Sequence, residues 1–242
     1  MNCVILQPSY IPWRGFFDLV AQADVFVFYD DVQYDKHGWR NRNRIKTPTG
    51  TQWLTIPVLH RGNVEDGVEI REVRTDGRTK WARKHWQSVR QNYAKAPHFA
   101  RYAPMIEQLY DGAGEGLCDF TIASTIALAR EIGIAHTRFF RSSELGVVGA
   151  RTTRLVEIVK KVCATRYLSG PSASAYLVES EFSEAGIELA YAVYDYPEYP
   201  QLHGAYDAAV SILDTLFMLG PEVGDYTWGP RAKAHRARAS GG

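Results

Sequence analysis

Asp30 and Asp31 stand side by side directly after an apolar run, Val25 to Tyr29. A pair of carboxylates at the end of a buried strand could serve as a general base, or could hold a magnesium ion beside phosphate groups. The same pair could instead form a turn, because a carboxylate accepts hydrogen bonds from nearby backbone amides. The chemistry of Asp30 and Asp31 therefore depends on what else the fold brings to this point.

A second group of polar side chains lies in an alternating stretch. Arg40, Arg42, Arg44 and Lys46 are separated by neutral residues, so an extended chain would place all four cations on one face. Arginine forks grip phosphates and carboxylates in pairs, which favours an anion-binding site. The alternative is an edge strand whose charges deter aggregation. Both interpretations stay open on sequence alone.

The elements that must position these residues are two short apolar runs. Cys3 to Leu6 and Val25 to Tyr29 flank a helix-like segment, Phe16 to Ala23, which is typical of two buried parallel strands joined by a crossover. The loop after the first strand and the residues after the second should open onto the same edge of the sheet, where open α/β sheets bind ligands. The residues expected in this crevice are Gln7, Tyr10, Trp13, Asp30 and Asp31.

Two excursions from the α/β pattern follow. Thr47 to Gly50 has turn chemistry, and Gln52 to Val58 reads as a return strand, so residues 36–60 form a predicted β-hairpin. Val68 to Arg74 alternates well enough for an amphipathic strand. Residues 80–133 hold three successive helical patterns, which predict a helical insertion packed beside the sheet.

The alternation then returns and places two more polar loops at strand ends. A small-residue loop, Ser169 to Ser174, follows the short strand Arg166 to Leu168 and offers backbone amides to an anion, although Ser172 or Ser174 could simply cap a helix. A loop rich in proline and tyrosine follows the strand Glu188 to Val193. Its polar members alternate: Tyr199, Gln201 and His203. His203 is therefore a candidate general base facing Gln7 from the C-terminal half.

The whole pattern predicts one α/β domain over residues 1–220, with a largely parallel, Rossmann-like sheet, a β-hairpin excursion and a helical insertion. The strands expected in this sheet are Cys3 to Leu6, Val25 to Tyr29, Arg166 to Leu168 and Glu188 to Val193. Thr137 to Phe140 reads as a further strand, and a helix from Tyr206 to Leu219 closes the fold. Residues 221–242 lose periodicity and are expected to be a disordered tail. The 45% hydrophobic content over 242 residues is enough for a sizeable core.

Composition excludes several classes of protein. The formal net charge of +1 gives no global field that favours nucleic acid or an anionic membrane. Cys3, Cys118 and Cys163 lie far apart in apolar or helical contexts, which favours reduced thiols without metal-ligand spacing. The N-terminus has no basic region, and no apolar run reaches the length of a membrane span. We therefore expect a cytoplasmic protein.

Several motifs together resemble the WbqC-like protein family. They are Gln7-Pro8-x-Tyr10-x-Pro12-Trp13-x-Gly15, Asp30-Asp31-Val32-Gln33-Tyr34, Trp39-x-Asn41-Arg42-Asn43-Arg44-Ile45-Lys46, Tyr167-Leu168-Ser169-Gly170-Pro171-Ser172, and Tyr199-Pro200-Gln201-x-His203-Gly204 followed by Ser211-Ile212-Leu213-Asp214. The resemblance implies an association with bacterial polysaccharide or natural-product biosynthesis. It leaves the reaction open.

The opening also weakly resembles the first strand and loop of nucleotidylyltransferases. Those enzymes carry a His-x-Gly-His signature where this chain has Trp13-Arg14-Gly15-Phe16. The glycine is kept and both histidines are absent, so only the fold analogy survives. Adenylylation through those histidines is not expected.

Three functions from different classes remain open on sequence alone. One is an enzyme that transfers an acyl, aminoacyl or similar group onto an activated sugar or related small molecule. Another is a nucleotide-dependent ligase or nucleotidylyltransferase, with Mg²⁺ as the cofactor beside the nucleotide. The third is a non-catalytic sugar-nucleotide-binding protein. All three take a phosphate- or nucleotide-bearing small molecule as partner, and oligomerisation is left open.

The candidate residues are shared by these hypotheses. The catalytic candidates are His203, Asp30 and Asp31. The substrate-binding candidates are Gln7, Tyr10, Trp13, Gln33, Tyr34, Trp39, Asn41, Arg42, Arg44, Lys46, Ser169, Gly170, Ser172, Tyr199 and Gln201. No metal ligands are assigned.

Overall fold

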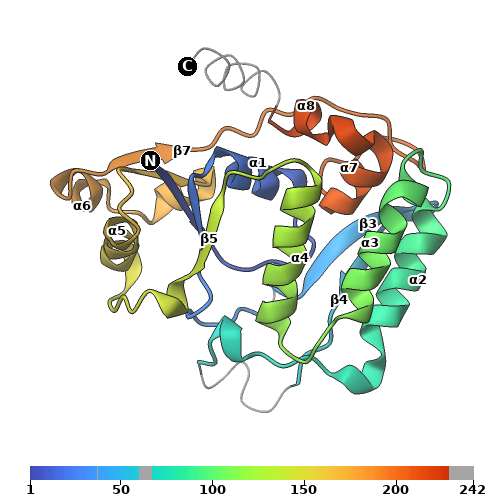
Figure 1. Ribbon diagram of the computed structural model, residues 1–242, viewed down its shortest axis with the longest axis horizontal. Coiled ribbons are helices and arrows are strands. Elements are labelled where there is room, and N and C mark those ends of the chain that lie inside the picture. The colour runs from blue at the N-terminus through green and yellow to red at the C-terminus, as the bar shows by residue number, and fades with distance from the viewer. Residues whose placement is uncertain (37, 60–66, 229–242) are drawn as a thin grey trace.

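The computed structural model describes residues 1–36, 38–59 and 67–228. Its centre is a five-stranded sheet in the order β5-β2-β1-β6-β7, and every neighbouring pair of strands is parallel (Figure 1). The strands are β1 (Asn2–Leu6), β2 (Val25–Phe28), β5 (Arg138–Arg141), β6 (Arg166–Ser169) and β7 (Glu188–Tyr191). The expected mixed α/β fold with a mostly parallel, Rossmann-like sheet is confirmed.

Both faces of the sheet are covered, which explains why its strands read as continuous apolar runs. Alternate residues of one strand enter different clusters of buried side chains. Phe26 and Phe28 belong to one cluster, and Val25 and Val27 to the other. Because side chains alternate along a strand, each apolar residue of β2 has a core to fill.

The helices divide unequally between the two faces. The larger cluster contains side chains from six helices: α1 (Arg14–Gln22), α2 (Trp81–Tyr93), α3 (Phe99–Asp111), α4 (Leu117–Glu131), α7 (Ile212–Leu219) and α8 (Val223–Thr227). The smaller cluster contains side chains from α5 (Arg151–Lys161) and α6 (Glu179–Glu184). On α2 the buried residues include His85, which is 8% exposed and packed among aromatic rings.

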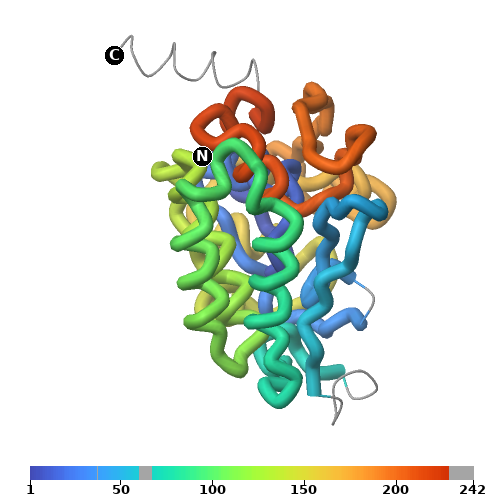
Figure 2. The backbone as a smooth tube through the Cα atoms, turned by 90° about the vertical axis from the view of Figure 1, so that its right-hand side faces the viewer, coloured from blue at the N-terminus to red at the C-terminus, as the bar shows by residue number. Residues whose placement is uncertain are grey.

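The predicted hairpin is present as a separate two-stranded sheet. β3 (Arg42–Thr47) pairs antiparallel with β4 (Gly50–Thr55) across the short turn that the sequence indicates. Ile45 and Leu54 bury one face of the hairpin, and β3 runs alongside α2 (Figure 2). The hairpin therefore stands beside the parallel sheet, and its other face is left available.

Three expectations about local structure are wrong. Within the described residues, Val68 to Arg74 contains a 3-10 helix, Ile70–Glu72, and makes only isolated bridges rather than a ladder. The closing helix begins at Ile212 rather than Tyr206, since the Ser211 side chain accepts a hydrogen bond from the Leu213 amide and caps it there. The predicted tail begins too early, because Val223 in α8 is buried. Residues 229–242 lie outside the described residues.

Candidate functional site

A cavity of about 1040 Å³ opens at the carboxyl edge of the parallel sheet. Its lining includes Gln7 directly after β1, Tyr29 directly after β2, and Gly170 directly after β6. The chain leaves β1 toward β2 on one side, and β6 lies on the other side. This is the topological switch point of the sheet, where open α/β folds bind ligands. We call this cavity the cleft.

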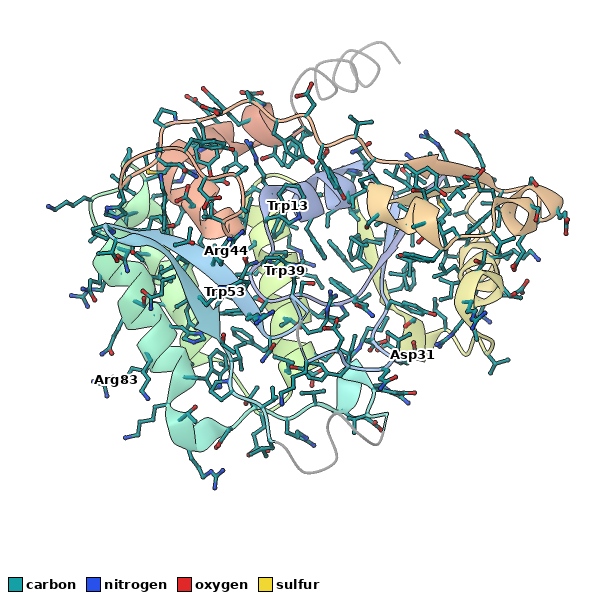
Figure 3. The ribbon with its side chains drawn as sticks, turned by 180° about the vertical axis from the view of Figure 1, so that it is seen from behind. Trp13, Asp31, Trp39, Arg44, Trp53 and Arg83 are labelled. Carbon is teal, nitrogen blue, oxygen red and sulfur yellow. The ribbon has the colours of Figure 1, made fainter. Side chains whose placement is uncertain are left out.

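The hairpin forms the opposite wall of the cleft. Trp39, Arg40, Asn43 and Arg44 line it from β3 and the residues before it. Figure 3 shows Trp39, Arg44 and Trp53 close together on this wall, and Trp13 nearby. The cleft therefore lies between a parallel sheet edge and a cationic, aromatic arm.

The charged side chains that line the cleft are all arginines. Among the residues that the structure describes, its lining holds Arg40, Arg44 and Arg151 and no aspartate, glutamate, histidine, lysine or cysteine. Three cations without an acid favour a ligand that carries negative charge, and guanidinium forks suit phosphate oxygens.

Two of these arginines have unused hydrogen-bonding capacity. The Nε atoms of Arg40 and Arg44 are buried, and neither has a hydrogen-bond partner within the described part of the chain. The nearest acid to Arg40 is Asp35, at a long 3.9 Å. Burial lowers the pKa of Arg40, against the attraction of Asp35. A partly buried cation with so little compensation is stabilised when an anion enters.

The third arginine stands at the beginning of α5. Arg151 is the first residue of that helix, and its neighbour Thr152 also lines the cleft. The N-terminus of α5 has no side-chain cap. A helix N-terminus carries a partial positive charge, so it adds to the positive potential that the arginines already create.

Aromatic rings form the remaining wall. The Trp13 ring meets Tyr194 edge-on, with ring centroids 5.0 Å apart. Tyr29, Tyr176 and Tyr194 also line the cleft. Burial raises the pKa of Tyr194 to about 12, so its hydroxyl stays protonated at neutral pH and can donate a hydrogen bond.

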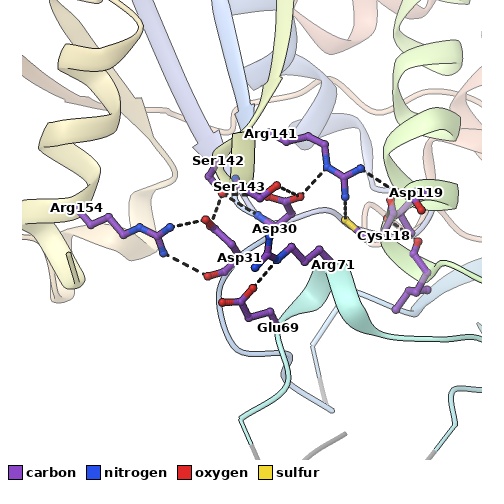
Figure 4. A network of polar contacts seen from close by, with 12 residues as sticks. Asp30, Asp31, Glu69, Arg71, Cys118, Asp119, Arg141, Ser142, Ser143 and Arg154 are labelled. Carbon is purple, nitrogen blue, oxygen red and sulfur yellow. Dashed lines mark hydrogen bonds and ion pairs between the residues drawn. The ribbon is translucent and has the colours of Figure 1, made fainter. Parts of the chain in front are cut away.

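Asp30 and Asp31 do not line the cleft; each is held by an arginine (Figure 4). Asp30 is fully buried, and it pairs with Arg141 at 2.7 Å and accepts hydrogen bonds from Ser143. Although burial alone would raise the pKa of Asp30, these hydrogen bonds lower it. Asp31 pairs with Arg154 and accepts from Ser142.

The same contacts bear on metal binding. Asp30 and Asp31 are the carboxylates that the sequence suggests for a magnesium ion. To reach them, the ion would have to displace Arg141 or Arg154. Within residues 1–36, 38–59 and 67–228, no three acids, histidines or cysteines gather as metal ligands would. The donor set at Asp30 and Asp31 therefore does not fit a metal ion without rearrangement.

Lys46 and His203 also lie apart from the cleft lining, together with Tyr199 and Gln201. The Lys46 ammonium donates to the carbonyl of Ala205, and the His203 ring is 2.8 Å from the carbonyl of Asn92. These contacts hold the segment 199–211, which ends beside the cleft with Ala208 and Ala209 in its lining.

Asp214 is the centre of that arrangement. It is fully buried and accepts hydrogen bonds from Tyr93, Tyr199 and Gln201 at 2.8, 2.8 and 2.9 Å. Burial raises the pKa of Asp214, and the three donors oppose that rise. Sequence reasoning did not single out Asp214 as a site residue.

The remaining candidates fall into two groups. Gln7, Trp13, Trp39, Arg44, Gly170 and Ser172 line the cleft as expected. The others do not line it: Tyr10, Gln33, Tyr34, Asn41, Arg42 and Ser169. Tyr10, for example, is fully buried, and its hydroxyl lies 2.8 Å from Nδ1 of His85 and 2.6 Å from the Tyr110 hydroxyl.

Several lining residues were missed. Arg40 was named among the alternating cations and Asn43 lies in the same stretch, but neither was placed among the substrate-binding candidates. Arg151, Tyr176 and Tyr194 come from elements far along the chain and carry no local signal that sets them apart. The cleft therefore lies at the predicted edge of the sheet, the candidate residues cover only part of its walls, and their role in binding stays a prediction.

Most of the residues that line the cleft fall within residues 7–226, which match the model of the WbqC-like protein family. The chain belongs to the WbqC-like protein family. It is 43% identical over 224 residues to a Mycobacterium tuberculosis protein named "Uncharacterized protein Rv1507c", with 92% of this chain and 95% of that protein covered. No solved structure matches the chain significantly. In this WbqC-like chain, no helix within the described residues is long and apolar enough to cross a membrane.

Proposed function

We propose that the cleft binds a phosphate-bearing small molecule, such as a nucleotide or a nucleotide-activated sugar. The observation that carries this proposal is the lining of the cleft, whose charged members are all arginines. Arg40 and Arg44 reach it from the hairpin and Arg151 from α5, so an anion between them would meet cations from two sides. Aromatic rings beside the arginines suit the ring of the same ligand.

We further propose that the bound molecule takes part in group transfer, in which an acyl, aminoacyl or similar group passes to an activated sugar or related small molecule. The size of the cleft is compatible with this proposal. At about 1040 Å³ it lies at the upper end of ligand pockets, which run to about 1,000 Å³, and so has room for two reactants.

The contribution of the protein would then be positioning and charge stabilisation. Holding two reactants in the correct geometry removes much of the entropic barrier to their reaction. Arginines fixed around the cleft would stabilise negative charge that develops on a leaving group or an oxyanion. Among the described residues, the lining includes no carboxylate or imidazole, so we assign no acid–base step to it.

Calorimetric titration with phosphate-bearing compounds tests the binding proposal. Arg44→Ala should weaken the ligand by about tenfold to a hundredfold, because a hydrogen bond to a charged group contributes about 1.5–3 kcal/mol. Arg83→Ala is the matched control, since Arg83 is an exposed arginine of α2 that does not line the cleft (Figure 3). Equal affinity in the wild type and both variants would exclude the arginine site.

Mass spectrometry separates an enzyme from a binding protein. The purified chain is incubated with acyl and aminoacyl donors and with any nucleotide sugar that binds in the titration. An added mass on the sugar in the presence of the wild type, and its loss with Arg44→Ala, supports group transfer. Binding without any change of mass across the panel would support the non-catalytic alternative.

A further inference from the structure

Two tryptophans of the hairpin region are exposed to solvent. Trp39 is 45% exposed and Trp53 is 44% exposed, whereas Trp81 and Trp86 are buried. The rings of Trp39 and Trp53 lie 5.4 Å apart at a tilt of 31°. Exposed indoles side by side leave apolar surface in water, which often marks a binding site. We call this pair the tryptophan platform.

Arginines hold the platform in place. The guanidinium of Arg42 lies 4.6 Å from the centre of the Trp53 ring, and that of Arg44 lies 5.5 Å from it. Arg44 and Trp53 are direct partners in the β3–β4 ladder. The Trp39 backbone is tied as well, because its carbonyl accepts a hydrogen bond from the Tyr10 amide at 3.0 Å. The platform is thus formed before any ligand arrives, so little ordering cost falls on binding.

The platform contributes to the hairpin side of the cleft. Trp39 lines the cleft together with Arg40 and Arg44, and the Trp53 ring packs against the Trp39 ring. Gln7, Gly170 and Ser172 line it from the ends of β1 and β6, on the sheet side. The cleft therefore offers an aromatic surface and cations on its hairpin side, and amide and hydroxyl groups on its sheet side.

We propose that the tryptophan platform stacks the base of a nucleoside diphosphate sugar, whose diphosphate meets Arg40 and Arg44 and whose sugar points toward Gln7 and Ser172. This inference rests on the proposed function and names its substrate class. A planar base gains most from stacking on an indole and needs no hydrogen bonds to do so. A sugar ring needs acceptors for its hydroxyls, and the arginines beside Trp39 are donors only.

The test compares a compound that has a base with one that has none. Uridine, guanosine and thymidine diphosphates are titrated beside inorganic pyrophosphate, against the wild type and Trp39→Ala. Because Trp39→Ala loses the stacking of one base, its affinity for the nucleotide that binds the wild type most tightly should fall by roughly fivefold to a hundredfold. Pyrophosphate should bind the variant as it binds the wild type. Trp39→Phe keeps a stacking ring and should retain most of the affinity for the nucleotide.

A second variant guards against a loss of folding. Trp39→Leu keeps apolar bulk without an aromatic face, and circular dichroism checks each variant before titration. Weaker binding of the nucleotide by the folded Leu variant, with pyrophosphate unchanged, supports the platform.

The outcomes distinguish the tryptophan platform from the proposed anion-binding site on which it rests. One outcome is that Arg44→Ala binds pyrophosphate more weakly, while Trp39→Ala still binds the nucleotide more tightly than pyrophosphate by the wild-type factor. That outcome excludes the platform and supports the anion site. If Trp39→Ala weakens pyrophosphate and nucleotide equally, Trp39 does not recognise a base and the inference fails. If neither a nucleotide nor pyrophosphate binds the wild type, both proposals fail.

Discussion

The guanidinium of Arg141 and the carboxylate of Asp30 meet at 2.7 Å at the carboxyl ends of β5 and β2, with the carboxylate fully buried and the arginine side chain 27% exposed. Arg141 also pairs with Asp119, whose carboxylate is 70% exposed. One arginine thus bridges a buried acid and an exposed one. The buried acid depends on this cation, because a buried charge without a partner is costly.

We therefore expect Asp30→Asn to lower the free energy of unfolding. Removing one partner of a buried ion pair costs about 3–5 kcal/mol. Urea unfolding should show a loss of about this size. Asp119→Asn is the control, because an exposed pair with the same arginine contributes at most about 1 kcal/mol. Unchanged stability of Asp30→Asn together with lost turnover would instead support the catalytic role predicted from the sequence.

We expect Lys46→Met to affect the stability of the fold more than ligand binding, in contrast to Arg44→Ala. Lys46 is 4% exposed, and its ammonium donates to the carbonyls of Gly204 and Ala205. Leaving buried acceptors unpaired costs about 1–3 kcal/mol, so the free energy of unfolding should fall. The affinity for pyrophosphate should change less than in Arg44→Ala. A variant with wild-type stability and strongly reduced affinity would show that Lys46 serves the ligand.

Gly15→Ala should displace Trp13 from the wall of the cleft. A Cβ atom at Gly15 would overlap the outer atoms of the Trp13 ring, so that ring must move. In an ordinary helix this substitution stabilises by about 1 kcal/mol. Here we expect a change in tryptophan fluorescence and weaker ligand binding. Gly77→Ala is the control, since nothing lies near its added Cβ. Unaltered fluorescence and affinity would contradict this packing.

His85 should make the protein sensitive to mild acid. Burial lowers the pKa of His85 from 6.5 to about 4. As the pH falls, the unfolded chain takes up this proton first, so stability is lost between about pH 6.5 and pH 4. The loss is at most of the order of 3 kcal/mol. Urea unfolding at pH 7 and pH 5 should show a smaller difference in His85→Gln than in the wild type.

An exposed histidine provides the control for that measurement. His136 is exposed and contacts the carbonyl of Ala21. His136→Gln should keep the pH dependence of the wild type. A pH dependence that disappears in His136→Gln and persists in His85→Gln would contradict the assignment.

The sequence by itself determined the strands of the sheet and the edge at which the cleft opens. Continuous apolar runs such as Val25 to Phe28 indicate strands buried on both faces, and the structure has them parallel. Because loops after parallel strands meet at one edge, Gln7 and Gly170 could be placed together from chain order. Alternation along residues 40–46 likewise indicated a cationic strand, and it brings Arg44 to the cleft.

Only the tertiary structure decided which charges are free to meet a ligand. Asp30 is neutralised by Arg141 and Asp31 by Arg154, each more than a hundred residues away in the chain. Lys46 points into the segment 199–211, although Arg44, two residues earlier, lines the cleft. Local periodicity shows which way a side chain faces but not what packs against it. Because ion pairs and burial depend on contacts between distant segments, the partner of each charge was fixed by folding.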